Sequence, residues 1–134
     1  MSGEKLLLDT NIVIDYLKGI DAVVSFIDER PTAELFVSVI TRMELLSFGG
    51  MQPAEAEAIH GFLDAVNVIP LNDEVEQFAI SVRRSTRRKM PDAIVAATAL
   101  WLDATLITAD GQLAKTNFPD LRVVLVGAPP DPQG

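Results

Sequence analysis

Short aliphatic runs of strand length alternate along this chain with longer segments that have helical periodicity. This alternation constrains the fold most, because strands separated by helices need crossover connections and so form a parallel sheet. The runs are apolar at nearly every position, which is typical of strands that helices cover on both faces. The five expected strands span residues 5–9, 34–39, 66–70, 104–108 and 122–126. The sequence therefore predicts an α/β fold with a mainly parallel sheet.

The spacing of apolar residues predicts helices between the later strands. Apolar positions recur at helical intervals in two segments, with Ile59, Phe62, Leu63 and Val66 in the first and Val75, Phe78, Ala79 and Val82 in the second. The first segment covers residues 53–65, and the second starts at Asp73, which with Glu76 resembles a capping box. A third segment, residues 90–102, tolerates Pro91 in its first turn and is apolar nearly all round, so we expect it to be buried.

The length of 134 residues suits one domain, which we expect to span residues 1–126. Residues 127–134 are rich in proline and glycine and are expected to form a flexible tail. The longest candidate apolar run, residues 93–102, is too short to cross a bilayer, and the first residues lack the apolar core of a secretory signal. Cysteine is absent, which excludes disulfides and thiolate zinc sites. We therefore expect a cytoplasmic protein that does not bind membranes.

Basic residues are concentrated in one segment of an otherwise acidic chain. The net charge is −8, which argues against broad coating of nucleic acid. Nevertheless, five of the eleven basic residues lie within residues 83–89. Their arginines are candidates for guiding an RNA phosphate backbone, or they form a solvated helix end that complements the helix dipole. The candidate RNA-binding residues are Arg42, Arg84, Arg87 and Arg88.

Four acidic residues from remote parts of the chain are expected at one edge of the sheet. Asp9 ends the first strand, and Asp110 follows the fourth by two residues. Asp92 lies in the first turn of its helix, and Glu44 lies about one turn into the helix after the second strand. Ligands of open parallel sheets bind at the carboxyl edge, where these helices also begin. Each acid also has a structural alternative: Asp9 as a helix cap, Asp92 as a dipole partner and Asp110 as a turn residue.

Carboxylates that converge in this way need a compensating cation, because closely spaced negative charges repel and raise one another's pKa. Mg²⁺ or Mn²⁺ prefers such oxygen ligands and can activate water for attack on a phosphodiester. Thr10, Asn11 and Thr108 are candidates for orienting Asp9 and Asp110. The single histidine, His60, is poorly suited to metal-free RNA cleavage, which relies on paired acid and base groups.

Four motifs, in this order and at these separations, resemble those of PIN-domain ribonucleases, especially the VapC-type toxins of toxin–antitoxin pairs. They are LLLDTNIVIDYL, TRMELL, MPDAIVAATAL and LITADGQL, and the similarity extends from Leu6 to about Val126. The resemblance implies a three-layer α/β/α sandwich around a five-stranded parallel sheet, and Mg²⁺- or Mn²⁺-dependent hydrolysis of RNA. Carried over by motif, the metal-binding and catalytic residues are Asp9, Glu44, Asp92 and Asp110, supported by Thr10, Asn11 and Thr108. Many relatives have a further acid where this chain has Leu113, so the fourth ligand is expected to be Asp110 itself.

The resemblance also implies partners. A VapC-type toxin forms a homodimer and binds a cognate VapB-type antitoxin, which inserts a peptide near the acidic cleft. An arginine of that peptide could occupy the carboxylate cluster when the metal is displaced. The antitoxin carries the DNA-binding domain, so contact with DNA would be indirect.

Two other classes of function are considered: a phosphoaspartyl protein, which also has an aspartate after its first strand, and a module with a similar fold that only binds. A phosphoaspartyl phosphatase would need another acid two residues after Asp9, where this chain has Asn11. A receiver-type signalling domain would need a lysine late in the chain at a strand end, and Lys115 is not well placed for that role. The remaining alternative is a non-catalytic PIN-like binding module, against which the presence of all four acids argues.

Overall fold

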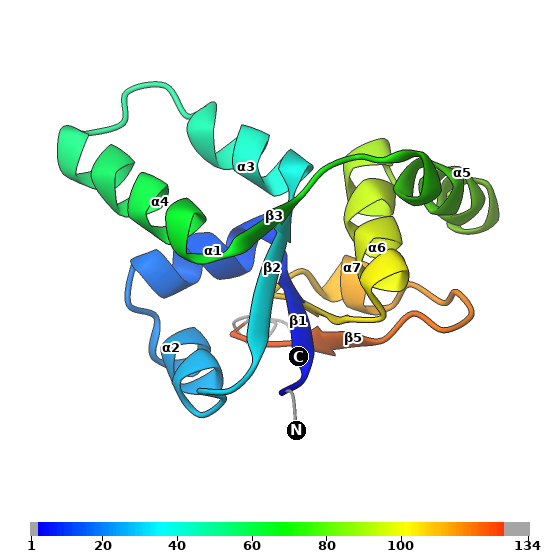
Figure 1. Ribbon diagram of the computed structural model, residues 1–134, viewed down its shortest axis with the longest axis horizontal. Coiled ribbons are helices and arrows are strands. Elements are labelled where there is room, and N and C mark those ends of the chain that lie inside the picture. Colours follow the sequence, from blue (N-terminus) through cyan, green and yellow to red (C-terminus); the bar gives the residue numbers. More distant parts are fainter. Residues whose placement is uncertain (1–2, 128–134) are drawn as a thin grey trace, which may run out of the picture.

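The computed structural model describes residues 3–127, which form a five-stranded parallel sheet with seven helices (Figure 1). The strands are β1 (Lys5–Leu8), β2 (Glu34–Ser38), β3 (Asn67–Ile69), β4 (Thr105–Thr108) and β5 (Val123–Leu125), in the order β3-β2-β1-β4-β5. The helices are α1 (Thr10–Leu17), α2 (Asp21–Asp28), α3 (Val39–Leu46), α4 (Pro53–Ala65), α5 (Asp73–Thr86), α6 (Met90–Leu102) and α7 (Gly111–Ala114). The expected tail, residues 127–134, lies outside the described residues apart from Gly127.

Helices cover both faces of the sheet, which confirms the three-layer α/β/α sandwich. Figure 1 shows α1, α2 and α4 on one side of the sheet and α5, α6 and α7 on the other. Successive residues of β1 pack against opposite helix layers because side chains alternate between the two faces of a sheet along a strand. Leu6 and Leu8 pack with α1, α2 and α4, whereas Leu7 packs with Val95 and Ala99 of α6.

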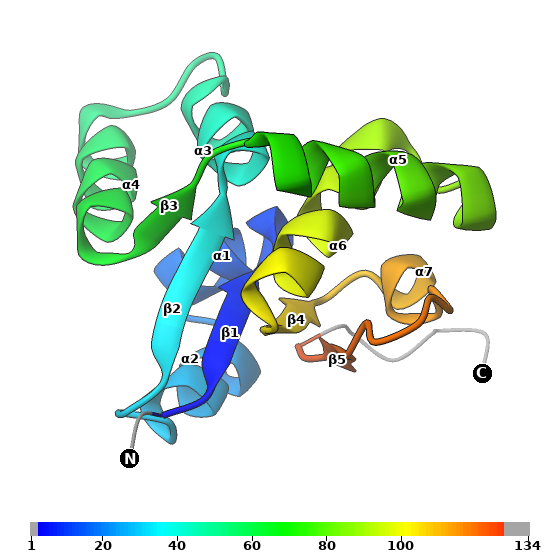
Figure 2. The same ribbon diagram turned by 45° about the vertical axis from the view of Figure 1, so that its right-hand side comes forward.

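The carboxyl end of β1 lies at the centre of the sheet, where strand order reverses. Lys5 of β1 is in register with Glu34 of β2, and Leu6 is in register with Thr105 of β4. The chain leaves β1 into α1 and leaves β2 into α3 at the same edge (Figure 2). This edge is therefore where an open α/β sheet binds its ligands.

The strand and helix expectations agree with the structure, with two corrections on α5. The helix is capped by Asn72, whose side chain accepts a hydrogen bond of 2.8 Å from the N–H of Val75, so the expected capping box of Asp73 and Glu76 is wrong. Phe78 belongs to the expected apolar face but is 38% exposed. The reason is that α5 lies against α6 on the outside of the layer (Figure 2). The buried residues of α5 are Val75, Ala79 and Val82, which form a narrow stripe.

Helix α6 is buried as expected, with every residue from Ala93 to Ala99 inaccessible or nearly so. None of the helices within residues 3–127 is both long enough and apolar enough to span a membrane.

Candidate functional site

Asp9 lies at the end of β1, and both of its carboxylate oxygens are held by hydrogen bonds. Oδ1 accepts from the N–H of Thr10 at 2.9 Å, which makes Asp9 the N-cap of α1. Oδ2 accepts from the hydroxyl of Thr108 at 2.8 Å and from the side-chain amide of Asn11 at 3.3 Å. Only 8% of Asp9 is exposed. The carboxylate is therefore fixed in one orientation at the sheet edge.

Thr108 and Asn11 join the ends of β1 and β4. The Thr108 hydroxyl accepts from the N–H of Asp110 at 3.0 Å, and Asn11 Oδ1 accepts from the N–H of Ala109 at 3.0 Å. Asp110 in turn caps α7, with its Oδ1 accepting from the N–H of Gln112 at 2.9 Å. The capping and turn roles that sequence alone allowed are thus real, and they leave other oxygen lone pairs of both acids available.

Glu44 reaches the same edge from α3. The hydroxyl of Thr10 lies 2.5 Å from Glu44 Oε1 and 3.1 Å from the hydroxyl of Thr41. Because the Thr10 hydroxyl has one proton, it donates to the carboxylate and accepts from Thr41. Thr41 is fully buried and was missed by the sequence reasoning. Its position one turn before Glu44, on the same face of α3, is the signal that could have found it.

All four predicted acids line one cavity of about 260 Å³. Asp9, Glu44 and Asp110 are joined there by Asp92 from the first turn of α6. The remaining lining residues are Thr10, Asn11, Ile14, Pro91 and Val95. Four segments that are distant in sequence therefore place their carboxyl groups around one small space.

The carboxyl groups affect one another electrostatically. Burial raises the pKa of Asp9 most, the hydrogen bonds from Thr108 and Thr10 oppose that shift, and the charges of Asp92 and Glu44 raise it further. The pKa of Asp92 is also raised, first by burial and then by the charge of Asp110. Glu44 adds to the rise at Asp92, while the nearby cations Arg88 and Lys89 oppose it. Burial and mutual repulsion therefore both disfavour the charged forms of Asp9 and Asp92.

The acids are not arranged as a finished coordination shell. Within residues 3–127, no three of the potential ligand side chains lie close enough together to hold one metal ion. The donor set still fits a hard divalent cation, because it consists of oxygens and its carboxylates repel one another. Binding an ion would require the side chains to move inward from their present positions.

The four candidate RNA-binding arginines lie outside this cavity. Arg42, on α3, is exposed, as are Arg84 and Arg87 at the end of α5. Arg88 is half-buried and is the one of the four whose charge lowers the pKa of Asp92. A role for Arg42 in binding RNA stays a prediction.

Comparison with known proteins identifies this arrangement. The sequence model of the PIN-domain family matches residues 6–119 of this chain, and this range contains every residue of the cavity. The chain belongs to the PIN-domain family. No curated protein sequence matches the chain.

Solved structures similar to this PIN domain include chains of toxin–antitoxin complexes. A toxin–antitoxin complex from Klebsiella pneumoniae matches at 28% identity with a TM-score of 0.76, covering 89% of this chain and 95% of that one. VapBC-1 from nontypeable Haemophilus influenzae matches at 25% identity with a TM-score of 0.76, covering 90% and 97%. VapBC2 from Rickettsia felis, bound to a promoter DNA fragment, has the same fold, with a TM-score of 0.79 over 91% and 98% at 18% identity. These neighbours support a VapC-type toxin, and PIN domains of that type are generally nucleases.

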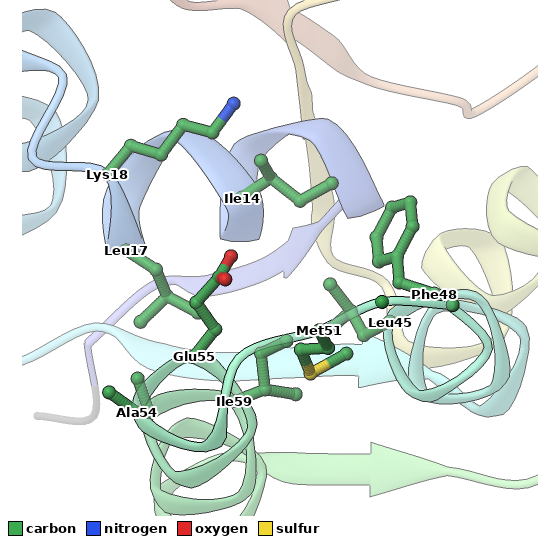
Figure 3. Close-up of a pocket in the computed structure, with 12 residues that line it drawn as sticks. Ile14, Leu17, Lys18, Leu45, Phe48, Met51, Ala54, Glu55 and Ile59 are labelled. Carbon is green, nitrogen blue, oxygen red and sulfur yellow. The ribbon is translucent and has the colours of Figure 1, made fainter.

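The PIN domain has a second, larger hollow beside the acidic cavity (Figure 3). This groove has a volume of about 600 Å³ and is lined by α1, the end of α3, the following loop and α4. In Figure 3, Ile14 extends toward Phe48, and Lys18 extends away from the groove. Ile14 lines both the groove and the acidic cavity, so the two hollows are neighbours.

Proposed function

We propose that this PIN domain is a metal-dependent endoribonuclease and the toxin of a VapBC-type pair. The observation that carries the proposal is the meeting of four carboxylates, from β1, α3, α6 and the β4–α7 connection, in one cavity at the sheet edge. Membership of the PIN-domain family and the toxin–antitoxin neighbours support it.

Asp9, Glu44, Asp92 and Asp110 would hold Mg²⁺ or Mn²⁺. When bound, such an ion lowers the pKa of a water molecule, so that it can attack a phosphodiester, and offsets charge on the leaving oxygen. The protein keeps Asp9 oriented through Thr108 and Asn11, and keeps Glu44 oriented through Thr10. These hydrogen bonds restrict the orientations of Asp9 and Glu44, and completing the site requires the four carboxylates to draw closer together.

Cleavage of RNA by active-site variants tests the proposal. Wild type, Asp9→Asn and Asp92→Asn should be incubated with total RNA in Mg²⁺, Mn²⁺ or EDTA, with Asp64→Asn, an exposed acid of α4, as the charge-matched control. We expect cleavage by wild type and Asp64→Asn only, and only with a divalent metal. Equal cleavage by all four proteins would contradict the mechanism, and phosphoryl labelling of Asp9 would instead indicate a phosphoaspartyl protein.

The groove is suited to a peptide of a VapB-type antitoxin, which we include in the proposal. Its lining is mainly apolar, with Leu17, Leu45, Phe48 and Met51 among the residues. A peptide that fills the groove would reach the acidic cavity past Ile14, where a basic side chain would be stabilised by the carboxylates. Any DNA binding would then come from the antitoxin.

A homodimer is the other assembly that we propose. Support comes from the large apolar side chains that α5 and α6 leave exposed, namely Phe78, Ile80, Met90 and Trp101. Apolar groups of this size that are exposed on one pair of helices favour an interface. Light scattering after size-exclusion chromatography tests it, and a monomeric mass at micromolar concentration would contradict it.

A further inference from the structure

The segment of residues 83–89, here called the basic turn, carries positive charge that the rest of the domain does not neutralise. Within residues 3–127, the ion pairs are Arg30 with Glu4 and Arg122 with Asp103, and neither involves the basic turn. The acids of α5 lie in the first turn of the helix, at the opposite end from the basic turn. The basic turn is therefore the one concentrated cationic feature of an acidic chain, whose other basic residues are scattered.

Arg83 is exposed, but its guanidinium group is engaged by carbonyl groups of the basic turn itself. One guanidinium nitrogen, NH1, donates to the carbonyl of Arg88 at 2.7 Å and to that of Arg87 at 3.3 Å. These bonds hold Arg87 in the left-handed conformation, with φ 60° and ψ 20°, which costs a residue with a side chain about 1 kcal/mol. The Thr86 hydroxyl adds a contact by accepting from the N–H of Arg88 at 3.3 Å.

Because these hydrogen bonds fix the backbone of the basic turn, its other basic side chains start from fixed positions from which they can bind an external anion. Arg84, Arg87 and Lys89 are exposed. Arg83 and Arg84 lie in the last turn of α5, where cations complement the helix dipole. Arg87 and Lys89 lie beyond that turn, so the dipole alone does not account for the exposed cations.

The basic turn borders the acidic cavity. Lys89 is the N-cap of α6, and Asp92, which lines the cavity, lies in the first turn of the same helix. A strand held on the basic turn would thus be next to the carboxylates that are proposed to hydrolyse it.

We propose that the basic turn binds the phosphate backbone of the RNA strand that enters the cavity, with Arg84, Arg87 and Lys89 as contacts and Arg83 as a positioning residue. This inference rests on the proposed function. RNA is favoured over an acidic protein because a flexible polyanion can follow cations around a turn, and guanidinium groups bind phosphate through two hydrogen bonds at once. The acidic remainder of the surface would repel the strand from other routes.

Binding of RNA without cleavage tests the contacts. A labelled single-stranded 20-nucleotide RNA is titrated with wild type, the Arg84→Gln/Arg87→Gln double variant and Arg122→Gln in EDTA, over a series of salt concentrations. Each lost phosphate contact should reduce the magnitude of the negative slope of log K against log salt by about 0.7. If the affinities converge at about 1 M salt, the double variant should bind about 25-fold more weakly at about 0.1 M salt. Arg122, an exposed arginine just before β5 at the opposite sheet edge, provides the control and should change affinity less than twofold.

The positioning role of Arg83 is tested by substitutions that keep the charge. Arg83→Lys should weaken binding about fivefold, because the exposed side chains lose their fixed arrangement. Lys89→Arg keeps a cation at a contact position and should change affinity less than twofold. Equal affinities of the Arg83→Lys and Lys89→Arg proteins would overturn the role of Arg83, and thermal melting of each variant confirms that it is folded.

Three results would overturn the basic turn as an RNA site. They are wild-type affinity in the double variant, no RNA binding by wild type even at low salt, or displacement of the RNA by polyglutamate as readily as by unlabelled RNA. Cleavage in Mg²⁺, measured in parallel, separates this inference from the proposed function. A double variant that cleaves with unchanged KM leaves the nuclease intact and refutes the site, whereas a wild type that binds RNA through the basic turn without cleaving refutes the nuclease alone.

Discussion

Replacing Thr108 by valine removes one hydroxyl from the centre of the candidate site while keeping the shape of the side chain. Thr108 is fully buried. Its hydroxyl donates to Asp9 at 2.8 Å and accepts from the N–H of Asp110 at 3.0 Å. Thr108→Val therefore leaves one carboxylate oxygen with a single long hydrogen bond, from Asn11, and leaves the N–H of the half-buried Asp110 without its acceptor.

The expected destabilisation is about 2 kcal/mol, the scale for losing a buried hydrogen bond to a charged group. No cavity term is added because valine fills the same volume. With an unfolding entropy of about 2.1 cal/mol/K per residue, a chain of 134 residues should lose about 7 °C in Tm. The pKa of Asp9 should also rise further, because the Thr108 hydrogen bond is what lowers it most.

Thermal unfolding in EDTA, followed by circular dichroism, measures this effect. Thr116→Val is a matched control, since Thr116 is also buried but its hydroxyl has no hydrogen-bond partner within residues 3–127. The control should keep or slightly raise Tm, because it removes an unsatisfied polar group. A Thr108→Val protein as stable as Thr116→Val would refute the claim that the Thr108 hydroxyl holds the Asp9 carboxylate.

Three other predictions concern charge, capping and the groove. The raised pKa values of Asp9 and Asp92 mean that the folded state keeps protons that the unfolded state has released, so in EDTA the free energy of unfolding should fall as pH rises above about 4. Asp92→Asn should reduce that fall and raise Tm at pH 7 by roughly 1 to 3 °C, and an unchanged or lower Tm would count against the clustering of charge. Asn72→Ala should cost about 1 kcal/mol in urea unfolding through loss of the α5 cap, whereas Asp73→Ala should cost clearly less; equal losses would show that the cap is shared. Phe48→Asp should abolish capture by a VapB-type antitoxin and leave RNA cleavage intact, and retained capture would place the peptide elsewhere.

The fold was predictable where local pattern and tertiary packing agree. The strands β1, β2 and β4 are mainly aliphatic, and their sequence directly reflects burial between the helix layers, whereas Val124 and Leu125 of the edge strand β5 are 39% and 48% exposed. Helix α5 shows the limit of that reasoning. Its apolar spacing predicted a broad face that includes Phe78, but the face actually covered depends on the outer position of α5 against α6. Its cap is one residue earlier than expected because two neighbouring side chains, Asn72 and Asp73, are both good caps.

The meeting of the four acids was also predictable, because strand ends and helix starts share one edge of a parallel sheet. The residues that hydrogen-bond to these acids were harder to predict. The bond between Thr10 and Glu44 depends on how α1 approaches α3, and Thr41 looks like any buried helical residue in sequence. Arg83 could not be separated from its basic neighbours, since only the geometry of the turn shows that its guanidinium faces carbonyl groups.

Calorimetric titration of Mn²⁺ into the metal-free protein tests the shared carboxylate site most directly, because it needs no substrate. Wild type and Asp64→Asn should bind the ion with the same affinity, and Asp9→Asn and Asp92→Asn should each bind it at least about tenfold more weakly. Binding that these two variants leave unchanged, or no saturable binding by the wild type, would contradict the account.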